Sequence, residues 1–220
     1  MDCIHRTVQK RKGSCMEKTR KTDRRTIYTR NIIKDALLEL TKEKTYDTVN
    51  VSQLCRQAEI ARATFYLHYD SLDEVLDCII DDALEFSENS SDTLVDVLDL
   101  YHNRKNSPSA ASKTILPACQ RIADSDKYHH LFMDASIGNR IIHRIALHER
   151  DKVIPDFMER ADLSEDEADM MFRFILHGTF AVNRSLEWQK NARWYHYQRV
   201  LSEIISAGLI YHKADLSNGS

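Results

Sequence analysis

Two neighbouring stretches of the chain carry side chains suited to hydrogen bonding with a nucleic acid. The guanidinium of Arg62 can donate to both major-groove acceptors of guanine, and Thr64 offers a hydroxyl to a base or phosphate and a methyl to thymine. Asn50 and Ser52 lie at the start of the preceding predicted helix, where backbone amides and the partial positive charge of a helix N-terminus favour a phosphate. These residue types indicate binding of a polyanion rather than the making or breaking of a bond.

Motifs for catalysis and metal binding are absent from the sequence. It contains no glycine-rich phosphate loop, no Gly-x-Ser-x-Gly and no His-Glu-x-x-His, and its 5 cysteines form no Cys-x-x-Cys pair. His129 and His130 are adjacent, so they point about 100° apart on a helix. His143 and His148 lie five residues apart, whereas two ligands on one helix face lie four apart. We expect no catalytic residue, no metal and no cofactor; a helical enzyme without a recognised motif is the alternative.

The composition predicts a helical protein. The 220 residues are 42% hydrophobic and 30% charged, which allows a buried core in a chain of this length. Only 5 Gly and 3 Pro interrupt it, and this scarcity favours long helices over a many-stranded sandwich. No apolar run approaches the roughly 20 residues that span a bilayer, and the charged N-terminus lacks the apolar stretch of a signal peptide. We therefore expect an all-α, cytoplasmic protein.

The net charge of -3 conceals an uneven distribution of charge. Basic residues dominate before Asn31, whereas every charged side chain from Leu72 to Asp99 is acidic. A basic end followed by an acidic body suits a protein that meets a polyanion with one end only. A solvated basic tail beside an acidic helix face would give the same pattern, so charge alone leaves both interpretations open.

The hydrophobic periodicity before residue 70 predicts a helix-turn-helix. A first helix is expected over about 26–42, and a second begins after Asn50, whose side chain can cap it while Gln53 reaches back to the cap. The second helix ends near Glu59, and a third short helix runs over about 62–69 with Phe65 and Tyr69 on its core side. The tight turn between the last two helices is typical of a helix-turn-helix.

Helical patterns continue through the rest of the chain. Ser71 with Glu74 and Ser164 with Glu167 predict capping boxes at the starts of two further helices. The other helices are expected at about 91–102, 109–124, 126–136, 139–160 and 193–210, with Pro117 and Pro155 as kinks or breaks. The predicted organisation is a flexible basic arm (1–24), a helix-turn-helix DNA-binding domain (25–72), a helical ligand-binding and dimerisation domain (73–212) and a disordered tail (213–220).

The stretch Val51-Ser-Gln-Leu-Cys-Arg-Gln-Ala-Glu-Ile-Ala-Arg-Ala-Thr-Phe-Tyr-Leu-His-Tyr69 resembles the signature of TetR-family transcriptional regulators. The positions that match are Ala58, Ile60, Thr64, Phe65, Tyr66, His68 and Tyr69. Within that family, Phe174-Ile-Leu-His-Gly and Trp188 are similar to regulators of the dihydroxyacetone-kinase type. The sequence departs from the family at the turn glycine, the serine that caps the reading helix and a basic residue near the fourth helix, which are here Glu59, Ala61 and Leu72.

The resemblance implies that the third helix enters the major groove of DNA and that Tyr66 and His68 bond backbone phosphates. The full set of expected DNA-binding residues is Lys44, Thr48, Asn50, Ser52, Arg62, Ala63, Thr64, Tyr66 and His68. For the basic arm, insertion of Arg24 and Arg25 into the minor groove and a solvated tail both remain open.

The resemblance also implies a homodimer, paired through about 164–210, on a palindromic operator. Apolar stripes that face only the monomer core are the alternative. Members of the family enclose small-molecule effectors in the larger domain, and most are repressors. We therefore expect a repressor that a small molecule releases from its operator. The residues that bind this effector are unknown. A regulator switched by a protein partner is equally compatible with the sequence.

Overall fold

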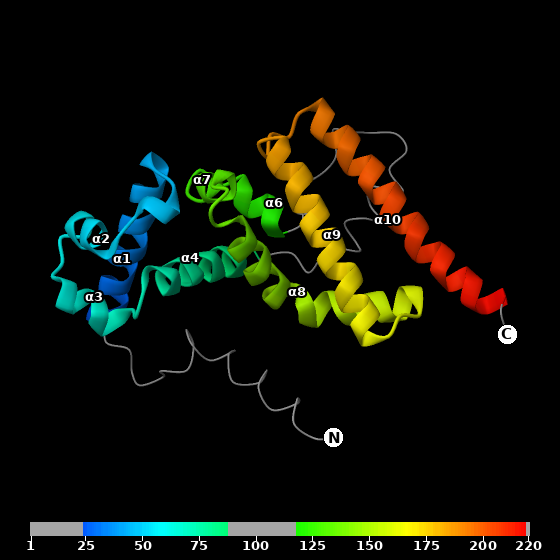
Figure 1. Cartoon of the computed structure of the whole chain (residues 1–220), viewed down its shortest axis with the longest axis horizontal. Helices are drawn as coiled ribbons and strands as arrows, with labels where there is room; N and C mark the ends of the chain where they lie inside the picture. The colour runs from blue at the N-terminus through cyan, green and yellow to red at the C-terminus, as the bar shows by residue number, and fades with distance from the viewer. Residues whose placement is uncertain (1–23, 88–117, 219–220) are drawn as a thin grey trace, which may run out of the picture. The chain divides into compact units, whose positions relative to one another are not determined.

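The computed structural model describes residues 24–87 and 118–218, and within these ranges all regular structure is helical (Figure 1). The predicted all-α class is therefore confirmed for the described residues. The expected helix at 91–102, the first part of the one at 109–124, Pro117 and residues 1–23 lie outside the described ranges. The chain divides into two compact units, unit 1 with residues up to 43 and 49–79 and unit 2 with residues 44–48 and 80–220.

Unit 1 contains the helices predicted before residue 70. They are α1 (Arg24–Glu43), α2 (Val51–Gln57) and α3 (Arg62–His68), and α4 (Leu72–Ser87) begins in this unit. The apolar spacing of α1 places Ile33 and Leu37 in a core with Leu54 of α2 and Phe65 of α3, all fully buried. Because all three helices contribute to this small core, α3 is held from one side and leaves its other side to solvent.

Unit 2 contains the end of α4 with α6 (Ala118–Ala123), α7 (His129–Met133), α8 (Gly138–Ala161), α9 (Glu165–Ser185) and α10 (Ala192–Asn218). α9 begins at the predicted capping box, in which Ser164 accepts from the Glu167 amide and Glu167 accepts from the Ser164 amide. Trp188 packs edge-on against Phe132 and Phe180 at ring-centroid distances of 5.1 and 5.2 Å, and the two phenylalanine rings lie tilted at 6.0 Å. No helix in the described ranges has the length and apolarity needed to cross a membrane.

Three features of unit 2 differ from the prediction. Pro155, expected to kink or break a helix, lies inside α8 and does not break it, because Val153, Ile154 and Phe157 are buried around it and packing outweighs the missing N–H. The helix expected at 126–136 is reduced to the single short helix α7, flanked by turns. Residues 213–218 are helical rather than a disordered tail, because no Gly or Pro interrupts α10 between Gly208 and Asn218.

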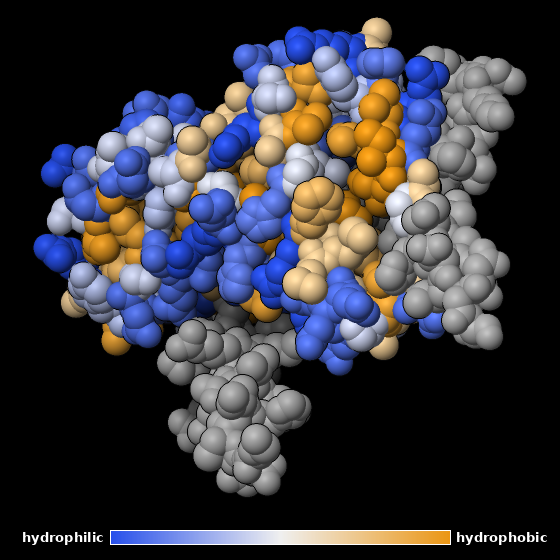
Figure 2. Space-filling view, turned by 45° about the vertical axis from the view of Figure 1, so that its right-hand side comes forward, coloured by the Kyte–Doolittle hydropathy of each residue, from blue (hydrophilic) through white to orange (hydrophobic). Residues whose placement is uncertain are grey.

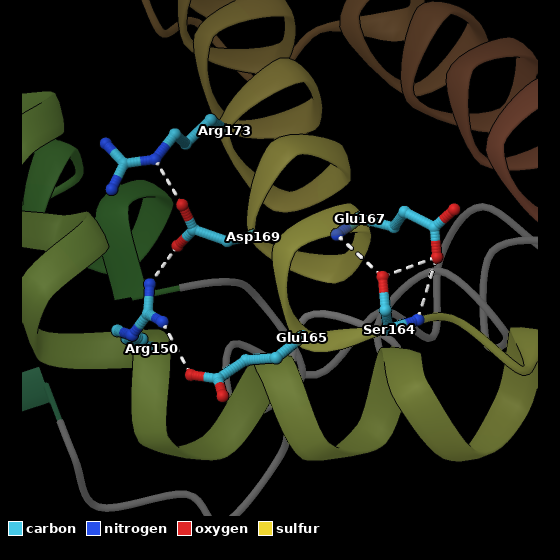
Figure 3. Close-up of polar contacts among 6 residues, drawn as sticks. All are labelled: Arg150, Ser164, Glu165, Glu167, Asp169 and Arg173. Atoms are coloured by element: carbon cyan, nitrogen blue, oxygen red, sulfur yellow. Dashed lines mark hydrogen bonds and ion pairs between the residues drawn. The ribbon is translucent and has the colours of Figure 1, made fainter. Parts of the chain in front are cut away.

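An ion-pair network fixes the first turns of α9 against α8 (Figure 3). The Arg150 guanidinium pairs with Glu165 at 3.0 Å and also with Asp169. Asp169 in turn accepts from Arg173 at 2.7 Å, one turn further along α9. Arg150 lies on α8 and the other three residues of the network lie on α9, so its pairs with Glu165 and Asp169 connect the two helices.

The described cysteines are structural. Cys55 and Cys78 are buried on the apolar faces where they were predicted. Burial raises the pKa of the Cys55 thiol, and burial raises the pKa of Cys119 to about 12. These thiols therefore stay protonated at neutral pH and are poor nucleophiles.

Candidate nucleic-acid interface

The N-terminus of α2 is closed by the predicted capping box. Asn50 accepts a hydrogen bond from the Gln53 amide at 3.0 Å, and the Gln53 side chain accepts from the Asn50 amide at 3.1 Å. The Asn50 side-chain oxygen is therefore already engaged within the helix, and Ser52 is the exposed hydroxyl of this turn. Both residues expected to contact phosphate here are exposed, and the Asn50 side-chain oxygen is the atom that the capping box uses.

The turn between α2 and α3 keeps the backbone conformation that a glycine would adopt. Glu59 has a φ of 53°, in the left-handed region. The Glu59 amide donates to the Arg56 carbonyl at 3.2 Å and the Ile60 amide donates to the Cys55 carbonyl at 3.0 Å. This paired bonding ends α2 in the Schellman manner, which requires a left-handed residue. Glu59 in place of the family's turn glycine would be expected to shift the turn to a conformation that tolerates a side chain, and the left-handed φ shows that it does not.

Replacing Glu59 with Gly should raise the free energy of unfolding by about 0.5–1 kcal/mol. A non-glycine residue in the left-handed region costs about 1–2 kcal/mol, part of which glycine's greater chain entropy in the unfolded state offsets. Urea denaturation followed by circular dichroism measures the change. As a control, Arg56→Gly in the exposed last turn of α2 should shift stability the opposite way. A lower denaturation midpoint for Glu59→Gly would contradict the assigned strain.

The start of α3 has no side-chain cap. Ala61 occupies the N-cap position with extended backbone and makes no side-chain hydrogen bond. Ala61 stands where the family has a capping serine, and its methyl side chain forfeits a capping bond worth about 1 kcal/mol. The first backbone amides of α3 therefore receive no hydrogen bond from the side chain at position 61. The side chain of Arg62, the first residue of this helix, is exposed.

The outward face of α3 differs in part from the predicted set of side chains. Arg62, Ala63 and Tyr66 are exposed, whereas Thr64 and His68 are half-buried beside the core. Leu67 shares the exposed face and is 82% exposed, although sequence reasoning did not select it. The missed signal was the i, i+4 spacing of Ala63 and Leu67, opposite to the core residue Phe65.

The orientation of α3 is fixed by its buried aromatic residues and by one arginine of α1. Phe65 and Tyr69 are buried, as predicted. The Arg30 guanidinium donates to the His68 carbonyl at 2.9 Å and lies 4.2 Å from the centre of the Tyr69 ring. It also contacts the sulfur of Cys78 in α4 at 3.5 Å. Arg30 thus joins α1, α3 and α4, a role that its place in a basic N-terminal stretch concealed.

Burial and the nearby Arg30 charge lower the pKa of His68. The folded pKa therefore lies below the unfolded value of about 6.5, and the imidazole is neutral at neutral pH. The unfolded chain therefore binds the His68 proton more readily than the folded chain. Above about pH 6.5 His68 does not change the free energy of unfolding, and it lowers this free energy as pH falls through the folded pKa. A neutral His68 can still donate one hydrogen bond to a phosphate.

Two expected phosphate contacts lie in the segment that groups with unit 2. Lys44 is half-buried, and Thr48 is exposed with its hydroxyl donating to the Thr45 carbonyl at 2.7 Å. Within that unit the Tyr46 amide donates to the Asp134 carboxylate at 2.7 Å. Unit 1 therefore contains seven of the nine expected DNA-binding residues, whereas Lys44 and Thr48 belong to the other unit. The seven are Asn50, Ser52, Arg62, Ala63, Thr64, Tyr66 and His68.

Comparison with known proteins gives one significant sequence relative and one structural neighbour. No family model matches the chain. The chain is 38% identical over 65 residues to the Uncharacterized HTH-type transcriptional regulator YxbF of Bacillus subtilis (strain 168), a match covering 29% of this chain and 17% of that protein. The Dihydroxyacetone kinase operon activator DhaS has 23% sequence identity and a TM-score of 0.39, with 86% of this chain and 97% of that chain covered. Over the matched 65 residues, the chain is thus similar to a helix-turn-helix transcriptional regulator.

Proposed function

We propose that this chain is a DNA-binding transcriptional regulator of the TetR type and that α3 reads the major groove. The observation that carries the proposal is the outward face of α3. It presents Arg62 and Tyr66 beyond a tight turn, while Phe65 and Tyr69 anchor the opposite side. The second helix of a helix-turn-helix enters the major groove, and in this chain that helix is α3. The Arg62 guanidinium on its exposed first turn can therefore donate hydrogen bonds to a guanine. The similarity to a regulator described as HTH-type supports the same assignment.

Selection of bound duplexes from a random pool, at a stated salt concentration, tests the proposal. The expected result is an enriched palindrome whose half-sites each contain a guanine and are spaced by about one helical turn. Failure to enrich any sequence from the pool would overturn the proposed function.

The proposed regulator acts as a homodimer through α9 and α10. α10 buries Trp194, Gln198 and Ser202 at four-residue spacing, so its inward face is largely polar. Val200, Leu201 and Ile205 of the same helix are half-buried, and Ile204 is 64% exposed. On α9, Phe174 is 74% exposed, one turn from the exposed Met170. Figure 2 shows apolar surface on unit 2.

An apolar face left open by the monomer is the expected property of a pairing surface. Gly178 on α9 and Gly208 on α10 have open space where a Cβ would stand, which allows a partner helix to approach closely. A second copy satisfies both faces, because two-fold DNA half-sites require two-fold protein symmetry. The proposal that the two stripes face only the monomer core is disfavoured by the exposure of Phe174 and Ile204.

We assign the signal-receiving role to the interior of unit 2. Asn183 accepts hydrogen bonds from Trp194 Nε1 at 2.7 Å and Gln198 Nε2 at 3.1 Å, and Gln198 accepts from Gln120 at 3.4 Å. Within the described ranges, Gln120 Oε1 and Trp188 Nε1 are buried without a hydrogen-bond partner. A small polar effector that bonds these atoms would release repression by changing the population of DNA-binding dimers.

Native mass spectrometry of the purified cytoplasmic protein tests this part of the proposal. A small molecule that remains on the dimer supports an effector. An empty dimer that captures a protein partner instead would favour regulation by that partner and would remove the effector from the account.

The pH dependence of DNA binding should report the contact of His68. If His68 faces a phosphate, the DNA charge raises its lowered pKa, and the protein takes up a proton on binding. Affinity should then rise as pH falls from about 8 to about 6, by up to about tenfold per pH unit between the free and bound pKa values. Fluorescence anisotropy at several pH values measures how affinity changes with pH. His68→Gln should abolish the rise in affinity that occurs as pH falls. The same slope in both proteins would contradict a phosphate contact of His68.

A further inference from the structure

The exposed face of α3 is chemically divided along its length. Arg62 and Tyr66 form a polar edge, and Ala63 and Leu67, four residues apart, form an apolar edge. Leu67 is 82% exposed, more than any other large apolar side chain for which exposure is described. Phe65 and Tyr69 fill the core side of the helix, so Leu67 has no place in the core of unit 1.

A helix that enters the major groove meets four different base edges, of which only thymine carries a methyl group. The apolar edge of α3 lies beside the guanidinium that is placed for guanine. We infer that Leu67, together with Ala63, reads the C5-methyl of a thymine in each half-site. The inference rests on the proposed function and adds a specificity-determining residue that the polar side chains do not supply.

The contact should give a modest preference for thymine at one position of each half-site. Burying one methyl-sized group changes an equilibrium by about fourfold. Arg62 and Leu67 lie on opposite edges of the exposed face, so a thymine at a fixed offset from the guanine is expected in the selected half-site. A cytosine at that place would carry a hydrogen at C5 instead of the methyl and an amino group instead of the O4 acceptor.

Replacement of thymine by deoxyuridine isolates this contact, because it removes the methyl and keeps the base pair. Each thymine of the selected duplex is replaced in turn, and the dissociation constant is measured for the full chain and for Leu67→Ala. At one position per half-site, deoxyuridine should raise the dissociation constant of the unsubstituted protein about fourfold. This penalty should vanish in Leu67→Ala. Leu67→Met, which keeps an apolar side chain, should retain it.

Leu147→Ala provides the matched control, because Leu147 is an exposed leucine of α8 in the other unit. This variant should keep the full deoxyuridine penalty. Leu67 is exposed, so its truncation leaves the core of unit 1 unchanged, and an unaltered helical circular dichroism spectrum confirms the fold. A selected duplex insensitive to deoxyuridine at every thymine, or a penalty that persists in Leu67→Ala, overturns the inference and leaves the proposed function intact. A pool in which no sequence is enriched overturns both.

Discussion

Replacing Arg62 with Ala should weaken binding to the selected duplex by about 1–3 kcal/mol and flatten discrimination at one base pair of each half-site. Arg62 is exposed at the first turn of α3, and no side chain caps this turn. A bidentate bond between guanidinium and guanine is the commonest specific contact of such helices, and its loss has this magnitude. Because the side chain is on the surface, the substitution should leave the fold unchanged.

Competition with duplexes that differ at each base in turn measures this effect. Arg193→Ala is a suitable control, because Arg193 is an exposed arginine of α10 and carries the same charge in unit 2. This variant should leave both the affinity for the duplex and the base preference unchanged. If Arg62→Ala lowers the affinity for selected and for random duplexes by the same factor, Arg62 contacts only phosphate.

Replacing Phe174 with Glu should convert the proposed dimer to a monomer at micromolar concentration. In a two-fold interface each substitution occurs twice, and losing the burial of a phenylalanine costs about 1.5–3 kcal/mol at each site. The dimerisation constant should therefore fall by at least about a hundredfold, and binding to the two-half-site duplex should fall with it. Light scattering and anisotropy measure the two effects.

Phe86 offers a matched control for the dimer surface. It is 76% exposed, close to the 74% of Phe174, but lies on α4. Phe86→Glu should leave the dimer and its DNA affinity unchanged. A Phe174→Glu protein that remains dimeric would remove α9 from the pairing surface, and a protein that is monomeric without any substitution would remove the two-half-site arrangement.

Local signals in the sequence predicted local features well. The Asn50–Gln53 and Ser164–Glu167 capping boxes are both present, because each depends on residues within one turn of the chain. The burial of Phe65 and Tyr69 follows from their spacing on one side of a short helix. The all-helical class followed from the scarcity of Gly and Pro.

Features that depend on distant residues were not predicted. The inward polar face of α10 exists because Asn183 of α9 hydrogen-bonds Trp194 and Gln198, a pairing that no local pattern encodes. Arg30 looked like one charge in a basic stretch, whereas it bonds the end of α3. The exposure of Leu67 follows from the packing of α3 through Phe65, and a helix of seven residues offers only the single pair Ala63 and Leu67 to indicate its outward face.

The most direct test of the account is the ratio of two dissociation constants, for the selected duplex and for a shuffled duplex of the same length and composition, at physiological ionic strength. A regulator that reads bases through α3 should bind the selected duplex at least about a thousandfold more tightly. Equal affinities for the two duplexes would contradict sequence-specific recognition by this face.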